Sequence, residues 1–215
     1  MKIEQQLQEA FQWRYAVKKF DPIKKINQEQ WKILEEALLY SPSSYGLQPW
    51  KFFVVQNPNL RTQLRAVSWN QPQVEECSHY VVFTTLRKVT EDYIGSFIEQ
   101  MVAIRGGDTA QLDGYRKMMV GDLVNGGRSQ IIQHWSQKQA YIAMGNLMHS
   151  AALLKIDSCP LEGIDPKAYD KILNLEDSAY STAAAVALGH RASDDKYQQL
   201  KKVRFPKDQI IQIIN

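Results

Sequence analysis

Apolar residues along this chain recur at two different spacings, and the spacing changes several times between its two ends. Over residues 3–14 they fall three or four positions apart, which predicts an amphipathic helix. Asn27, with Gln30 three residues later, has the form of a capping box and predicts the start of a second helix, which Pro42 ends. Residues 134–155 hold the longest helical pattern, and its wide apolar surface predicts burial in the core or at a subunit interface.

Short runs of β-branched and aromatic residues predict strands between these helices. Such runs occupy residues 52–55, 80–84 and 156–159. Residues 181–189 fit either a central strand or an alanine-rich helix, and we favour a strand because the run is short and ends at a glycine. Further helices are predicted for residues 91–104, 109–123 and 166–173. The alternation of helices and strands indicates an α+β or α/β layered architecture.

The last residues of the chain are apolar, from Gln209 to Ile214. Free termini normally fray unless they are held in place. An apolar terminus is therefore expected to be docked, and one way to dock it is as an added strand on the sheet of a partner subunit.

Composition and charge narrow the function classes. A chain of 215 residues is expected to form one domain, residues 1–215, with 44% apolar and 23% charged residues as in soluble globular proteins. A net charge of +3 does not suggest nucleic acid as a partner, and the longest apolar run is too short to cross a membrane. With two cysteines outside any CxxC and no signal peptide, a reducing, cytoplasmic location is expected. The histidines show no metal-ligand spacing, so no metal site is expected.

Basic residues cluster near both ends of the chain. Arg14 and Lys18 follow the first predicted helix, where they could equally serve its dipole. Lys201, Lys202 and Arg204 lie near the C-terminus and could form a solvated basic face. Arg204 precedes Phe205-Pro206, and a guanidinium held by a rigid turn can bind a phosphate with two hydrogen bonds.

Two turn-rich segments lie between these basic clusters. Pro42-Ser43-Ser44 offers hydroxyl and backbone N–H groups of the kind that hold phosphates or ring carbonyls, although it also fits an ordinary turn after a helix. Glu162-Gly163 follows a predicted strand, and Gly163 would allow close approach of the backbone to a ligand. Cys159 is more typical of a buried free cysteine than of a nucleophile. Sequence signatures of dinucleotide-binding folds, P-loops, serine hydrolases and zinc proteases are absent.

These segments, in this order, resemble the FMN-dependent nitroreductase family along almost the whole chain. The family patterns R-x-S-x-[KR]-x-[FY], P-S-[SG]-x-x-x-Q-P-W, P-x-E-G and K-x-R-x-P correspond to residues 14–20, 42–50, 160–163 and 202–206. Each pattern is weak alone, but four of them in the right order are specific. The resemblance implies an α+β nitroreductase fold, with a central, mostly antiparallel sheet flanked by helices. It also implies a homodimer completed by exchange of C-terminal strands, with two FMN sites at its interface.

The resemblance further implies a role for individual residues. Arg14, Lys202 and Arg204 would hold the FMN phosphate, and Lys18 would lie beside N1 and the C2 carbonyl, where reduction places negative charge. The Glu162-Gly163 backbone would face N5, Asn70 would reach the pyrimidine side, and Pro42, Ser43 and Ser44 would come from the other subunit. The complete implied set is Arg14, Tyr15, Ala16, Lys18, Pro42, Ser43, Ser44, Gly46, Asn70, Gln73, Pro160, Leu161, Glu162, Gly163, Lys202 and Arg204.

Three positions depart from the family pattern. Ala16 replaces the usual serine, which removes a hydroxyl contact to the cofactor. Gly46 stands where relatives often carry asparagine, and Gln73 stands where some carry lysine. With less positive charge near the pyrimidine ring, we expect a lower flavin potential than in relatives with both lysines.

The implied activity is that of a cytoplasmic, homodimeric FMN oxidoreductase. NAD(P)H would reduce the flavin and leave, and a nitroaromatic, quinone or related conjugated acceptor would then react at the same site, which means ping-pong kinetics. The flavin would perform the chemistry, so no side chain is needed as a nucleophile. Candidate cavity walls are Tyr45 and residues 118–123. The alternatives are a narrower pteridine or enone reductase, a non-catalytic flavin-binding protein, and a scaffold protein that binds no chromophore.

Overall fold

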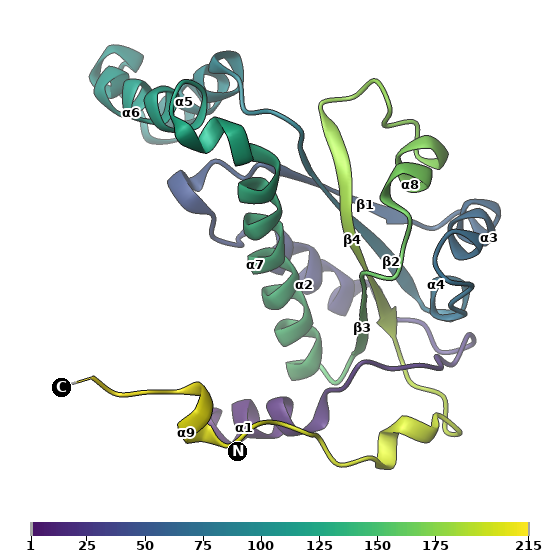
Figure 1. The fold of residues 1–215 in the computed structure, drawn as a ribbon. Helices are drawn as coiled ribbons and strands as arrows, with labels where there is room; N and C mark the ends of the chain where they lie inside the picture. Colours follow the sequence, from purple (N-terminus) through teal and green to yellow (C-terminus); the bar gives the residue numbers. More distant parts are fainter. Residues whose placement is uncertain (1, 215) are drawn as a thin grey trace.

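A central antiparallel sheet lies between layers of helices in a computed structural model, which describes residues 2–214 (Figure 1). Helices and 3-10 turns alternate with four strands along the chain. Their bounds are α1 Ile3–Trp13, α2 Gln28–Leu39, η1 Ser44–Gly46, β1 Trp50–Val55, α3 Pro58–Ala66, α4 Gln73–Glu76, β2 His79–Leu86, α5 Glu91–Arg105, η2 Thr109–Leu112, α6 Asp113–Leu123, η3 Gly127–Ile131, α7 Ile132–Leu153, β3 Asp157–Leu161, α8 Pro166–Ile172, β4 Tyr180–Gly189, η4 Lys196–Gln199 and α9 Lys207–Ile210.

The strands lie in the order β1-β2-β4-β3, and every neighbouring pair is antiparallel. β4 is paired on both sides, which explains why its sequence is small, apolar and free of charge. The predicted strand over residues 181–189 is therefore confirmed, and the alanine-rich helix is wrong. The α+β class with a central antiparallel sheet is confirmed as well.

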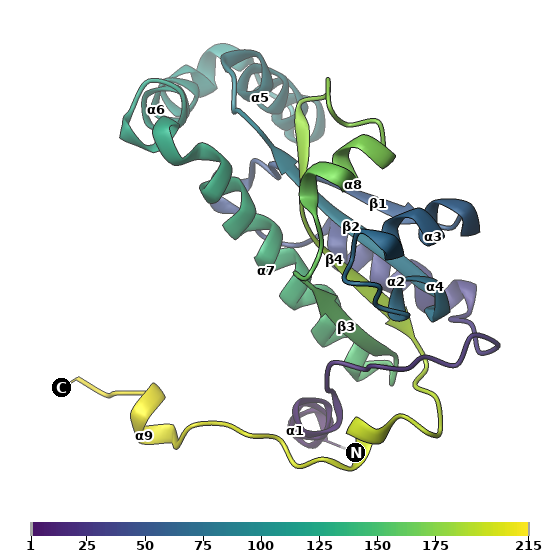
Figure 2. The same cartoon turned by 45° about the vertical axis from the view of Figure 1, so that its right-hand side comes forward.

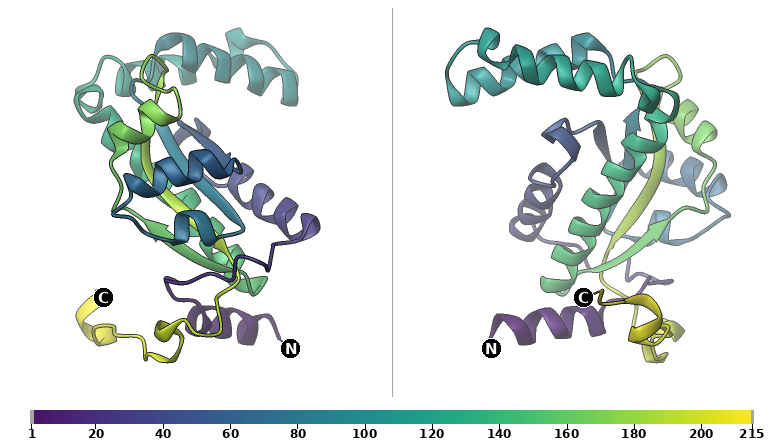
Figure 3. Two further views of the ribbon diagram at one scale, coloured as in Figure 1. Left: turned by 90° about the vertical axis from the view of Figure 1, so that its right-hand side faces the viewer. Right: turned by 60° about the vertical axis from the view of Figure 1, so that its left-hand side comes forward.

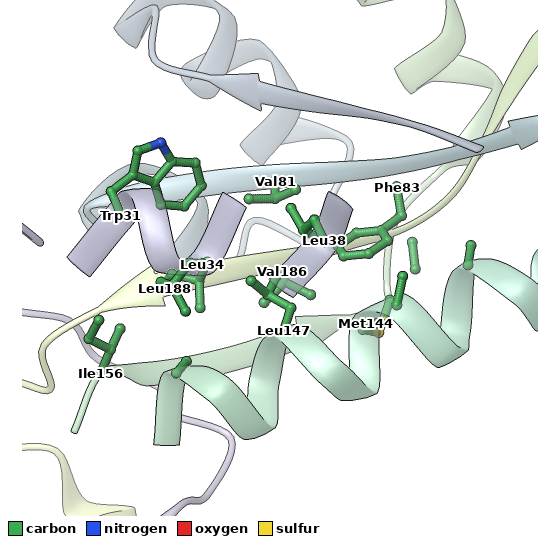
Figure 4. Packing of buried hydrophobic residues seen from close by; sticks show 14 of the residues in the cluster. Trp31, Leu34, Leu38, Val81, Phe83, Met144, Leu147, Ile156, Val186 and Leu188 are labelled. Atoms are coloured by element: carbon green, nitrogen blue, oxygen red, sulfur yellow. The ribbon is translucent and has the colours of Figure 1, made fainter. Parts of the chain in front are cut away.

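Alternate residues of each strand face the two helical layers, as the pleat requires. Val81, Phe83, Val186 and Leu188 face α2 and α7, and all four side chains are fully buried (Figure 4). Their immediate neighbours pack into a second cluster on the opposite face of the sheet, beside α3, α4 and α8 (Figures 1 and 2). Burial on both faces explains why the strands appear in the sequence as continuous apolar runs.

The long helix α7 crosses one face of the sheet next to α2 (Figure 1). Ala143, Leu147 and Ala151 recur at helical spacing and are completely buried against the strands. The opposite side of the helix carries Tyr141 and Ile142, which are 41% and 46% exposed. The predicted burial of this helix is thus confirmed for one face, and the other face is open in the single chain.

Helices α5 and α6 form an arm at one end of the molecule (Figure 3). Their apolar residues make a third cluster together with the first turns of α7. The helix predicted over residues 109–123 is shorter than expected. The first part, Thr109–Leu112, is a 3-10 turn capped by the Asp108 side chain, and α6 begins at Asp113.

Other differences from prediction have local causes. Helix α3 was not predicted, although Asn57 accepts hydrogen bonds from two backbone N–H groups of its first turn and Pro58 follows directly. The strand predicted over residues 156–159 is β3, which extends further than expected and ends with Pro160 and Leu161. A proline is tolerated there because β3 is an edge strand.

The C-terminal segment leaves the body of the chain after η4 and runs past α1 (Figure 2). Residues 200–214 are exposed, among them Ile210, Ile211, Ile213 and Ile214. Within one chain, this apolar segment is therefore not docked. No helix within residues 2–214 has the length and apolarity that crossing a bilayer requires.

Candidate functional site

The two ends of the chain meet at a cavity of about 380 Å³. Five of its nine lining residues are arginine or lysine, and none is acidic. The lining consists of Arg14, Tyr15, Ala16, Lys18, Tyr197, Leu200, Lys201, Lys202 and Arg204. Two of the four family segments, almost 190 residues apart in the sequence, thus form one cationic hollow.

Within residues 2–214, the cations of this cavity form no salt bridge with a carboxylate. Lys202 Nζ donates to the backbone carbonyls of Gln12, at 2.7 Å, and of Arg14. Burial lowers the pKa of Lys202, and the neighbouring Arg14 and Arg204 guanidinium groups lower it further. Arg14 Nε is buried without a hydrogen-bond partner among the described residues. A bound anion would satisfy that donor and relieve the repulsion among the cations.

A second group of predicted residues lies where β3 ends. Gln71 Nε2 donates to the Gly163 carbonyl at 3.1 Å, and the Asp165 N–H donates to Val67 O at 2.9 Å. These bonds hold the segment after α3 against the Glu162-Gly163 turn. Gly163 is needed for this packing, since a Cβ built on it would lie 2.6 Å from Cε3 of the Trp69 ring.

The N-terminal segment connects the two groups. Ala16 forms an isolated parallel bridge with Ser158, and the Val17 N–H donates to Ser158 O at 3.3 Å. Burial raises the pKa of the Cys159 thiol against the opposing effect of the Lys18 ammonium. Gln73 Nε2 lies 4.0 Å from Cys159 Sγ, while its buried Oε1 has no protein partner among the described residues. Lys18 and Gln73 therefore both lie beside β3, between the cationic cavity and the 162–163 turn.

Asn70 lies near this turn, but its side chain is directed elsewhere. Asn70 Oδ1 accepts a hydrogen bond from Arg65 Nε at 3.0 Å. Trp69 and Asn70 both have left-handed backbones, with φ of 50° and 55°. Trp69 is 83% exposed, which is unusual for so large an aromatic side chain.

The loop with Pro42, Ser43, Ser44 and Gly46 is not part of this group within one chain. The Ser44 N–H donates to Gln139 Oε1 at 2.9 Å, whereas Tyr141 of the same helix donates to Glu162. Gln139 and Tyr141 are two positions apart in the helix, so their side chains point in directions about 200° apart around its axis. The loop and the Glu162 turn consequently lie against different sides of α7.

This loop is held in an unusual conformation by the α5–α6 arm. Tyr45 has a left-handed backbone with φ of 61°, and its hydroxyl donates to Asp122 Oδ2 at 2.7 Å. Arg128 pairs with the same carboxylate at 2.9 Å, and Tyr115 donates to the Tyr45 carbonyl. Tyr45 was predicted to form a cavity wall together with residues 118–123, and the structure places it against that segment.

Sequence reasoning missed several residues of the cationic cavity. Tyr197 and Leu200 line it, and the buried Asp195 lies beneath it. Asp195 caps the turn η4, and an aspartate two residues before Tyr197 is a signal that could have been used. Arg191 stacks on the Trp13 and Tyr15 rings, and no local pattern in the sequence indicates that contact.

Comparison with known proteins gives consistent matches over the whole chain. The model of the Nitroreductase family matches residues 11–190. A protein of Staphylococcus saprophyticus is 35% identical over 220 residues, which cover 98% of this chain and 97% of that protein. Its name describes it as an NAD(P)H nitroreductase.

Solved structures share the fold at lower identity. The ydfN protein of Bacillus subtilis has a TM-score of 0.86 at 19% identity, covering 98% of this chain and all of that chain. A protein of Exiguobacterium sibiricum crystallised with FMN has a TM-score of 0.80 at 22% identity, covering 97% of both. An enone reductase of gut-bacterial fatty acid saturation has a TM-score of 0.80 at 19% identity, covering 97% of this chain and 98% of that chain.

The packing of Trp69 on Gly163 gives a first prediction. Gly163→Ala places a methyl group where the Trp69 ring lies, so the ring must move. Because Trp69 is 83% exposed, we expect a cost of only about 0.5–1.5 kcal/mol in the free energy of unfolding. In a Trp69→Ala background the same substitution should cost much less. Urea unfolding of the four proteins in this double-mutant cycle measures the coupling.

Gly145→Ala is the matched control, because a Cβ there meets no other atom within 4 Å and the helical position favours alanine. It should leave stability unchanged or raise it. Equal costs of Gly163→Ala with and without Trp69 would contradict the proposed contact.

Proposed function

Because the chain belongs to the nitroreductase family, an oxidoreductase family, we propose that it is an FMN-dependent enzyme. It would use NAD(P)H to reduce nitroaromatics, quinones or related conjugated acceptors. The observation that carries the proposal is the cationic cavity formed by Arg14, Lys18, Lys202 and Arg204. A phosphate-bearing cofactor suits this cavity because it would bring the missing counter-charge.

The residues present are compatible with FMN. Arg14 Nε is a buried donor without a hydrogen-bond partner in the part of the chain that the structure describes, and a phosphate oxygen would be its natural acceptor. The Exiguobacterium sibiricum protein of the same fold was crystallised with FMN, and the Staphylococcus saprophyticus relative is named for NAD(P)H. In this proposal Arg14, Lys202 and Arg204 would hold the phosphate.

The other proposed contacts place the ring system along β3. From the cavity, the N-terminal segment leads past Lys18 and the Ser158 bridge to the Glu162-Gly163 turn. When bound, FMN would supply the hydride chemistry between NAD(P)H and the acceptor. Lys18 would contribute positive charge where negative charge develops on reduction, and the Gly163 backbone would orient the ring.

We further propose that the site is completed by a second copy of the chain. The loop with Pro42, Ser43, Ser44 and Gly46 is held on a different side of α7 from the Glu162 turn, so it would serve the partner's cofactor. The apolar C-terminal segment is exposed, and the outer edge of β1 has no partner strand among the described residues, which suits exchange of C-terminal strands. We place this homodimer in the cytoplasm.

A narrower substrate range is the second candidate. One protein of the same fold is an enone reductase, and the same site could reduce an activated carbon–carbon double bond. In our proposal, substrate choice lies in the residues that cover the ring face, while the cationic cavity would serve either reaction.

The proposed function is tested by purifying the protein and titrating it with FMN. We expect a yellow, dimeric protein that oxidises NADH or NADPH in the presence of a quinone. Initial rates at several concentrations of both substrates should give parallel double-reciprocal lines, because the two substrates use one site in turn. A colourless protein that takes up no added FMN would exclude the proposal.

Arg204→Ala should weaken FMN binding by about 10- to 100-fold, since a charge-assisted hydrogen bond contributes about 1.5–3 kcal/mol. Fluorescence titration of the apoprotein measures the change. Lys207→Ala, which removes an exposed cation outside the cavity, is the control and should keep wild-type affinity. Wild-type affinity in Arg204→Ala would assign the C-terminal cations to the solvated surface.

Lys18→Gln should lower the midpoint potential of bound FMN, because the reduced ring loses a nearby positive charge. Spectroelectrochemical titration measures the potential. Lys19→Gln is a control one residue away, since Lys19 is exposed and paired with Asp194 outside the cavity. Equal potentials in the Lys18→Gln and wild-type proteins would remove Lys18 from the proposed site.

A further inference from the structure

One buried carboxylate ties the two ends of the chain together. Asp195 is 2% exposed and lies in the C-terminal part, just before η4. It accepts hydrogen bonds from the hydroxyl of Tyr15 and from the backbone N–H groups of Lys18 and Lys19, about 180 residues earlier in the sequence. Tyr15 and Lys18 are themselves part of the cavity wall.

The two carboxylate oxygens of Asp195 have separate partners. Oδ2 accepts all three bonds from the N-terminal segment, from Lys18 N at 2.9 Å, Tyr15 Oη at 3.1 Å and Lys19 N at 3.2 Å. Oδ1 accepts from Tyr197 N at 3.0 Å, which caps η4. A residue that only capped this turn would need one oxygen. The second oxygen is occupied entirely by the opposite end of the chain.

Asp195 is also the last buried residue that holds the C-terminal part to the N-terminal segment before the basic residues 201–204 begin. Upstream of it, backbone bonds hold the C-terminal part to the N-terminal segment, including Ala192 N to Lys19 O at 2.9 Å and Asp21 N to His190 O at 2.8 Å. Downstream, residues 201–204 are exposed, and Lys202 reaches Gln12 and Arg14 through its long side chain. The position of Lys202 and Arg204 relative to Arg14 therefore depends on where Asp195 fixes η4.

The geometry points to Asp195 as the positioning residue that assembles the phosphate-binding cations, and through them gives the protein its preference for FMN over riboflavin. This inference rests on the proposed function. Asp195 does not line the cavity and would touch no part of the cofactor. Its effect on the binding of oxidised flavin would fall mainly at the phosphate end. Among its partners, Lys18 alone would lie beside the ring, where its charge acts mainly on the reduced form, while Tyr15 and η4 lie at the cationic cavity.

The charge of Asp195 suits this role. Burial by itself would raise the pKa of the carboxyl, but hydrogen bonds from Tyr197, Lys18, Lys19 and Tyr15 outweigh that effect and lower it. Asp195 thus remains an anion beneath a cavity whose wall carries five cations. As a fixed internal anion it holds backbone donors in place and leaves the cationic side chains to face a ligand.

Asp195→Asn tests the inference, because it keeps the shape of the side chain and replaces one acceptor oxygen by an NH₂ donor. Both carboxylate positions face donors, so the amide NH₂ must oppose an N–H or O–H group in either orientation. We expect FMN affinity to fall at least about tenfold, while riboflavin affinity stays within about twofold of wild type. Fluorescence titration of the apoprotein with each flavin gives the ratio.

A second readout needs no flavin. In the apoprotein, hydrogen exchange of the Lys18 and Lys19 amides should accelerate in Asp195→Asn, while the amides of β2 and β4 keep their protection. Should Asp195→Asn fail to fold, Tyr15→Phe removes one of the three bonds to Oδ2 and should reduce the FMN-to-riboflavin affinity ratio by a smaller factor.

Asp194→Asn is the matched control, since Asp194 is the adjacent acidic residue, exposed and paired with Lys19. It should leave both affinities unchanged. An equal loss of FMN and riboflavin affinity in Asp195→Asn, or no loss of either, would overturn the inference. Failure of the wild-type protein to prefer FMN over riboflavin would instead count against the phosphate site, and hence against the proposed function.

Discussion

Pairing of β4 on both of its edges is the constraint on which the rest of the molecule depends. Between β2 and β3, residues 184–188 of this strand are completely buried on both faces and are all apolar. Its exit is equally constrained, because a Cβ on Gly189 would lie 3.0 Å from the Phe20 ring and 3.1 Å from Ser78 N. The chain leaves β4 directly beside the N-terminal segment, and the meeting of the two ends at one cavity follows from that exit.

The electrostatics of the cavity follow from how its neighbours are paired. Arg191 lies close by, but its guanidinium is bound to the buried Asp157 and stacked on Trp13. Arg14, Lys202 and Arg204 have no carboxylate partner among the described residues. The acidic residues near the site thus hold the backbone and Arg191, and the positive charge of the cavity wall is not neutralised by them.

Much of the fold could be predicted from the sequence because local pattern and burial agree. The core helix α7 and the strands β2 and β4 are apolar at the positions that the sheet buries. Predictions failed where the decisive contacts are distant, and also where a single local cap decides the structure. Pro160 belongs to a strand because the ladder with β4 continues to Leu161. The 3-10 turn before α6 depends on a single side-chain cap at Asp108.

The site shows the same division. The two basic segments were found from the sequence because arginine and lysine are recognisable there, and the cavity brings them together. The bonds from Asp195 to the N-terminal segment and the Trp69–Gly163 contact could not be found, since each joins residues about 90 to 180 positions apart. The left-handed backbones of Tyr45 and Trp69 likewise have no residue preference behind them, whereas Asn70 is of a type enriched in that region.

The anchoring of the Ser43-Ser44 loop to the α5–α6 arm has a consequence for how the protein would behave at low concentration. If each cofactor is enclosed only when two chains are associated, subunit association and flavin retention become linked equilibria. Dilution would then release flavin, and excess flavin would in turn favour the assembled pair. The cellular flavin supply would thus influence the quaternary state of the protein.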